Sequence, residues 1–82
     1  MAERAMREDG PSADGFCLLG TIRSAGGDRK AADAHYRKAL YLDPGHRESL
    51  AHLALLLESG GRTEQARVLR TRLRRLEQGD GA

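Results

Sequence analysis

The chain repeats itself at a shift of 34 residues, and this self-similarity constrains its fold more than any other feature. The pair Gly26-Gly27 falls on Gly60-Gly61, and the apolar and small residues around the glycine pairs fall on residues of the same kind. The matched positions are Phe16 with Leu50, Leu19 with Leu53, Gly20 with Ala54, Ala32 with Ala66, and Leu42 with Leu76. A repeat of this length with a glycine break in its middle predicts a helix–turn–helix unit that occurs twice.

Glycine and proline divide the chain into segments long enough for about three turns of helix, with short connections between them. We predict helices over residues 13–26, 29–42, 46–59 and 63–77, and short connections make consecutive helices antiparallel. The glycine pairs supply the left-handed conformation that ends a helix. Asp28 and Thr63 follow these pairs, and Asp43 precedes Pro44, so each is predicted to cap the next helix.

Composition favours an all-α fold. Only 4% of the 82 residues are aromatic, and β-branched residues are scarce, so strands have little material. Apolar residues instead recur at helical spacing: Leu50, Leu53, Ala54 and Leu57 share one helical face. Hydrophobic residues make up 39% and charged residues 32%, which is typical of a soluble domain, and the length allows one domain.

The first unit contains Phe16-x-x-Leu19-Gly20, then Ala32-x-x-x-Tyr36, then Pro44. This pattern resembles the tetratricopeptide repeat (TPR) family, which implies an α-α superhelix in which Gly20 and Ala32 face each other across the first hairpin. We expect repeat one over residues 13–46, repeat two over 47–80, an N-terminal segment over 1–12 that can form a short helix, and a flexible tail over 79–82.

The pattern also departs from the family. Arg23 stands where the family has an aromatic residue, and the second unit has Arg70 and Gln78 in place of the later aromatic residue and the proline. The last helix is therefore predicted to be a solvent-facing cap, which a short stack of repeats requires.

Two stretches, Ala39–Pro44 and Leu53–Glu58, together with Phe16–Gly20, resemble the C-terminal TPR region of CheR-type chemoreceptor methyltransferases of surface-sensing and biofilm pathways. The resemblance implies a non-catalytic accessory module for protein–protein interaction. The parent would be an S-adenosylmethionine-dependent protein-glutamate methyltransferase. This chain has no glycine-rich loop after a strand to bind that cofactor, so we expect neither a cofactor nor catalysis here.

The resemblance also implies that partners bind in a groove lined by the first helix of each pair. The helical wheel assigns to it the residues outside the core stripe, with acidic residues at its edges. They are Asp14, Cys17, Thr21, Ser24, Glu48, Ala51, Leu55 and Glu58. The predicted ligand is a peptide, such as a chemoreceptor segment, that carries at least one Lys or Arg; an ordinary solvated helix face is the alternative.

A second candidate surface is basic. Residues 60–82 hold six arginines against three acidic residues, and Arg67, Arg70 and Arg74 share one helical face. This face either docks on an acidic protein surface or is a solvated cap whose arginine stems cover apolar surface. Nucleic acid is not an expected partner, because no aromatic residues accompany these arginines.

Other sites are not expected. Cys17 lacks a histidine at helical spacing and is interpreted as a small hydrophobe. His35, His46 and His52 are not spaced as helical metal ligands, so no metal is predicted. The chain has no signal peptide and no apolar stretch that spans a bilayer, which predicts a cytoplasmic protein.

Two alternatives stay open beside the methyltransferase module. Two repeats are fewer than a stable stack needs, so the chain could gain burial by self-association into a homodimer or by docking on the parent enzyme. It could equally be a TPR adaptor unrelated to methyltransferases. A small standalone enzyme is disfavoured by the lack of an acid–base pair, metal ligands or a phosphate-binding loop.

Overall fold

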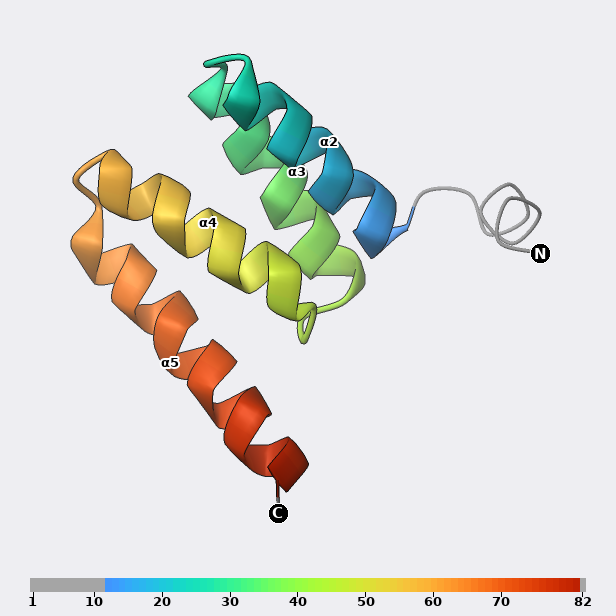
Figure 1. The fold of residues 1–82 in the computed structure, drawn as a ribbon, viewed down its shortest axis with the longest axis vertical. Helices are drawn as coiled ribbons and strands as arrows, with labels where there is room; N and C mark the ends of the chain where they lie inside the picture. Colours follow the sequence, from blue (N-terminus) through green and yellow to red (C-terminus); the bar gives the residue numbers. More distant parts are fainter. Residues whose placement is uncertain (1–11, 82) are drawn as a thin grey trace.

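The computed structural model describes residues 12–81, and within that range the chain is entirely helical, with no strand (Figure 1). The helices are α2 (Ala13–Ala25), α3 (Arg29–Leu42), α4 (Arg47–Ser59) and α5 (Thr63–Gly81). Helices α2 and α3 form one antiparallel hairpin and α4 and α5 form the next, with α3 and α4 in contact between them. The all-α, TPR-like prediction is confirmed. The predicted short helix over Ala2–Glu8 lies outside the described residues.

The helix ends follow from local chemistry. Ser12 caps α2 by accepting a hydrogen bond from the Gly15 amide at 3.1 Å. As predicted, Asp28 caps α3 by accepting from the Ala31 amide at 3.1 Å. The second glycine of each pair has a positive φ, 85° at Gly27 and 84° at Gly61, which only glycine adopts without strain. The glycine pairs therefore end α2 and α4 as the sequence indicates.

Three predicted boundaries are wrong. Asp43 does not cap α4, since its carboxylate accepts from the nearby Gly45 amide, and the imidazole of His46 accepts from the Ser49 amide instead. Thr63 is the first residue of α5 rather than its cap. Helix α5 continues to Gly81, so most of the predicted 79–82 tail is helical, because Gly79 here has an ordinary helical backbone and gives no stop.

The core lies between the hairpins and is built from small and branched side chains. The stripe on α4 is buried as predicted, and Ala66 is the point where α5 joins it. The fully or nearly fully buried hydrophobic residues are Cys17, Ala32, Tyr36, Ala39, Leu50, Leu53, Ala54, Leu57 and Ala66. The other apolar residues of α5 are half-buried or exposed, which agrees with the predicted cap.

Close packing in the first hairpin depends on Gly20. The atoms nearest to an added Cβ at this position all belong to the ring of Tyr36, two of them at 2.7 Å. The side chain opposite Gly20 is therefore Tyr36, one turn further along α3 than the expected Ala32. Tyr36 also stacks on His52 of α4, with ring centroids 5.7 Å apart, and thus joins both hairpins. Within residues 12–81, no helix is long and apolar enough to cross a membrane.

Candidate functional site

The predicted groove residues come from α2 and α4, the first helices of the two hairpins, and we call the surface between these helices the α2/α4 face. Its most accessible members are Ser24, Glu48 and Leu55, and the Leu55 side chain is 56% exposed. Ala51 is half-buried between them in sequence. The face therefore offers one exposed apolar side chain on α4, with carboxylates at its edges, as the sequence indicates.

One end of the α2/α4 face is held together by His46. Its Nδ1 accepts from the Ser49 amide, so the proton lies on Nε2, which donates to Oδ1 of Asp14 at 2.6 Å. This bond links the first turn of α2 to the start of α4. Asp14 therefore positions the two helices as well as lining the face, and sequence spacing gave no sign of this contact because the partners are 32 residues apart.

Asp14, His46 and Glu48 are the one set of potential metal ligands that the described residues bring together, with their ligand atoms within 4.8 Å of one another. Both nitrogens of His46 already make hydrogen bonds, one to the α4 amide and one to Asp14. The arrangement is accounted for by helix capping and an inter-helix hydrogen bond.

Cys17 corrects the predicted lining of the groove. Its side chain is only 5% exposed and belongs to the core, so a partner on the α2/α4 face does not reach it. Burial raises the pKa of the Cys17 thiol, and the carboxylates of Glu48 and Asp14 add to this rise against a hydrogen bond with Ser49. The thiol is thus held protonated, which fits its interpretation as a small hydrophobe rather than a nucleophile.

Thr21 is also more engaged than the helical wheel predicts. Its hydroxyl donates to the Cys17 carbonyl at 3.0 Å and lies 3.1 Å from the Tyr36 hydroxyl, so it satisfies the polar tip of a buried ring. Its role is to orient Tyr36 across the first hairpin, and it remains accessible beside the α2/α4 face.

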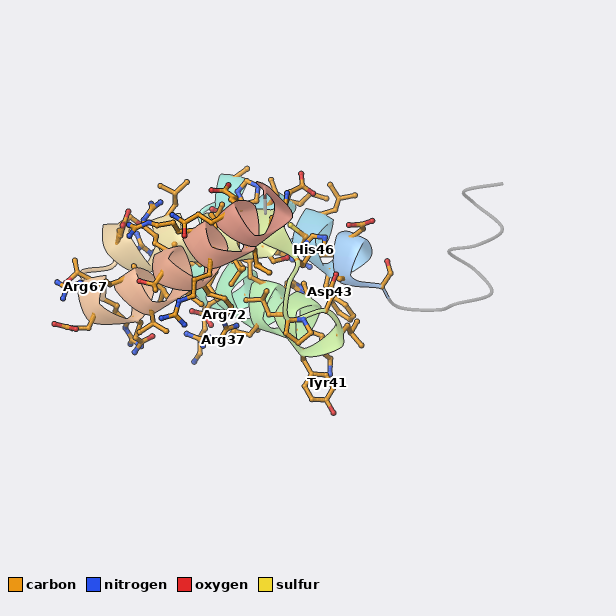
Figure 2. The ribbon with its side chains drawn as sticks, turned by 90° about the horizontal axis from the view of Figure 1, so that it is seen from below. Arg37, Tyr41, Asp43, His46, Arg67 and Arg72 are labelled. Carbon is orange, nitrogen blue, oxygen red and sulfur yellow. The ribbon has the colours of Figure 1, made fainter. Side chains whose placement is uncertain are left out.

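Glu58 and Arg70 connect the two surfaces that the sequence separated. The Arg70 guanidinium donates from Nε to one Glu58 carboxylate oxygen at 2.6 Å and from Nη2 to the other at 2.8 Å. The predicted basic face is therefore incomplete, because Arg70 turns towards α4. Arg67 and Arg74 remain exposed on α5, and Figure 2 shows Arg67 at one end of that helix, directed away from the body of the molecule.

The Glu58–Arg70 pair predicts a pH effect. Hydrogen bonds from Arg70 lower the pKa of the Glu58 carboxyl below its ordinary 4.5. Since the folded-state pKa is the lower one, the pair stabilises the fold above that ordinary value, and the contribution is lost as the pH falls through the folded-state pKa. We expect a carbon-detected NMR titration to show a lowered Glu58 pKa that Arg70→Gln restores. The control Arg74→Gln is expected to leave it lowered, and equal effects of both variants would contradict the assignment.

Residues 13–46 match the tetratricopeptide repeat family. Over 79 residues the chain is 46% identical to a Pseudomonas aeruginosa protein named probable biofilm formation methyltransferase WspC, which corresponds to 96% of this chain and 19% of that protein. A Pseudomonas putida protein of the same name is 44% identical over 73 residues, 89% of this chain and 17% of that protein. The chain thus spans less than one fifth of these curated relatives. No solved structure matches it significantly.

The matched repeat covers α2 and α3, and α4 and α5 form a second hairpin in the register that the 34-residue period demands. The chain is therefore a TPR-type helical module, and nearly its whole length is similar to one part of the biofilm formation methyltransferases.

Proposed function

We propose that the chain is a non-catalytic protein–protein interaction module that serves as the accessory TPR region of a chemoreceptor methyltransferase in chemotaxis-like or biofilm signalling. The observation that carries this proposal is the similarity of almost the entire chain to a minor part of two methyltransferases, combined with a fold built to bind proteins. The module works in the cytoplasm, where the linked enzyme methylates receptor glutamates with S-adenosylmethionine as methyl donor.

The α2/α4 face is the docking surface in this proposal. A receptor segment lies along it with an apolar side chain against Leu55 and a Lys or Arg beside the Glu48 carboxylate, which is exposed and lies near Asp14. Glu58 contributes less than the sequence suggests, since Arg70 already neutralises it. Binding here tethers the receptor to the catalytic domain and raises its local concentration, so the gain is greatest when the receptor is dilute.

The test is methyl transfer to the receptor by the longer methyltransferase. We expect deletion of the region that corresponds to this chain to slow the reaction at low receptor concentration and to have little effect at saturation. Leu55→Glu in the full enzyme is expected to reproduce the deletion. The matched control is Val68→Glu on α5, because Val68 is 60% exposed but lies off the α2/α4 face. Undiminished methylation after the deletion would refute the proposal.

Self-association is the second candidate, and the outer side of α2 favours it. Leu18 and Ile22 are 61% and 56% exposed, whereas their counterparts 34 residues later, His52 and Leu56, are partly covered by the first hairpin. A second copy of the chain, or another helix, could cover this side of α2. Light scattering discriminates the two candidates, since a monomeric mass at all concentrations excludes self-association.

A further inference from the structure

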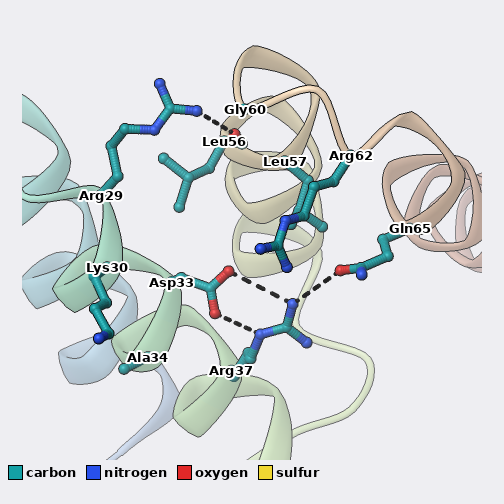
Figure 3. Close-up of a pocket in the computed structure, with 10 residues that line it drawn as sticks. All are labelled: Arg29, Lys30, Asp33, Ala34, Arg37, Leu56, Leu57, Gly60, Arg62 and Gln65. Carbon is teal, nitrogen blue, oxygen red and sulfur yellow. Dashed lines mark hydrogen bonds and ion pairs between the residues drawn. The ribbon is translucent and has the colours of Figure 1, made fainter.

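A second groove lies away from the α2/α4 face, between α3 and the turn that joins α4 to α5 (Figure 3). Its volume is about 900 Å³. Side chains of α3, of the end of α4 and of the following turn line it, and the residues that matter most are Arg29, Lys30, Arg37, Leu56, Leu57 and Arg62. We call it the α3 groove.

The wall formed by α4 is apolar and holds one arginine in place. Leu57 is buried and Leu56 half-buried at this wall. The Arg29 guanidinium donates to the Leu56 carbonyl at 3.2 Å and to the Ser59 hydroxyl at 2.8 Å. A Cβ at residue 60 would come within 2.7 Å of the same guanidinium nitrogen, so Gly60 allows this close approach. Arg29 is thereby fixed at the rim before any ligand arrives.

Arg37 is fixed on the opposite side. It donates to both carboxylate oxygens of Asp33 and also to the Gln65 side-chain carbonyl at 3.3 Å, which spans from α3 to α5. These contacts use the one carboxylate that lines the α3 groove. Asp33 is therefore already neutralised by its own helix neighbour.

The remaining charge is positive and lacks a counter-charge. Four cationic side chains and one carboxylate line the α3 groove. Neither the Lys30 ammonium nor the Arg62 guanidinium makes a hydrogen bond or ion pair with any residue in the described part of the chain. Figure 3 shows the Arg62 guanidinium reaching into the groove above Arg37. Cations gathered around an apolar wall attract and orient an anionic group.

We propose that the α3 groove binds an acidic segment of a protein partner. Carboxylates of the segment pair with Arg62 and Lys30, and an aliphatic side chain between them packs against Leu56 and Leu57. A peptide is favoured over a nucleic acid because no aromatic ring lines the groove to stack on a base, while leucine side chains are present to cover an aliphatic residue. This site is independent of the α2/α4 face and does not rest on the function proposed above.

The test uses the full 82-residue chain and a fluorescein-labelled octapeptide, Glu-Glu-Leu-Glu-Glu-Leu-Glu-Glu, followed by fluorescence anisotropy and by amide NMR shifts. We expect saturable binding with shifts centred on Arg29–Arg37 and Leu56–Arg62. Because an exposed ion pair contributes ~0.5 kcal/mol, the double variant Lys30→Ala/Arg62→Ala is expected to weaken binding about fivefold. The matched control, Arg72→Ala/Arg75→Ala on the outside of α5, removes the same charge and is expected to change affinity less than about twofold.

Several results would overturn the proposal. They are an absence of saturable binding, shifts confined to α2 and the exposed side of α4, and equal losses in the two double variants, which would indicate non-specific attraction to a basic protein. A single-stranded oligonucleotide that competes with the peptide at the same residues would instead assign the groove to nucleic acid. Unchanged circular dichroism of each variant shows that the fold is retained. The function proposed above fails independently, through loss of the Leu55→Glu effect.

Discussion

Replacing Leu53 with alanine is expected to lower the free energy of unfolding by ~2–5 kcal/mol, the range for a large-to-small change in a packed core. Leu53 is 1% exposed and lies where the two hairpins meet, so the cavity cannot be filled by a small local shift. A small domain is stable by only ~5–15 kcal/mol, and this loss would bring the chain close to unfolding. Urea denaturation followed by circular dichroism at 222 nm measures it.

The matched control is Leu55→Ala, two positions along the same helix. Leu55 is 56% exposed, so its truncation is expected to change the unfolding free energy by no more than about 0.5 kcal/mol. Should Leu53→Ala prove unfolded at the outset, Leu53→Met keeps the volume and is expected to cost less than about 1.5 kcal/mol. Similar losses at Leu53 and Leu55 would contradict the packing described for α4.

Replacing Gly20 with alanine is the second large effect. The added methyl group would lie 2.7 Å from two ring atoms of Tyr36, and that ring is held by Thr21 on one side and His52 on the other. Overpacking of this kind costs ~1–3 kcal/mol, which outweighs the ~1 kcal/mol that alanine gains over glycine in a helix. We therefore expect a net loss of stability in thermal and urea unfolding.

Gly79→Ala is the control for the sign of this effect. No atom lies within 4 Å of the position where its Cβ would be, and the backbone there is helical. The same substitution is therefore expected to be neutral or to stabilise by up to about 1 kcal/mol. A stabilising Gly20→Ala would show that α2 and α3 are further apart than the structure has them.

The fold was predictable because its determinants are local and are written twice. The glycine pairs and Asp28 act on their immediate neighbours, so their effect follows from sequence alone. The failures at Asp43 and Gly79 have a common cause. An aspartate before a proline can cap a helix or close a turn on itself, and a glycine can stop a helix or continue it, so the surroundings decide between the two.

The candidate site was less predictable, because a helical wheel gives the direction of a side chain but not what covers it. Cys17 points along the same side of α2 as Asp14, yet it is buried while Asp14 is exposed. The Glu58–Arg70 pair and the cations of the α3 groove come from different helices. Their meeting depends on how the hairpins are rotated against each other, and no pattern within one helix records that rotation.

The arginines of α5 give the stack a direction. Tyr36 of α3 packs against α4, but 34 residues later the same position of α5 is Arg70, so a further hairpin placed there would have to bury a guanidinium. The opposite end, at Leu18 and Ile22, carries no such barrier. A protein engineer could lengthen this solenoid only ahead of Ala13, and copies of the chain resist joining head to tail into filaments.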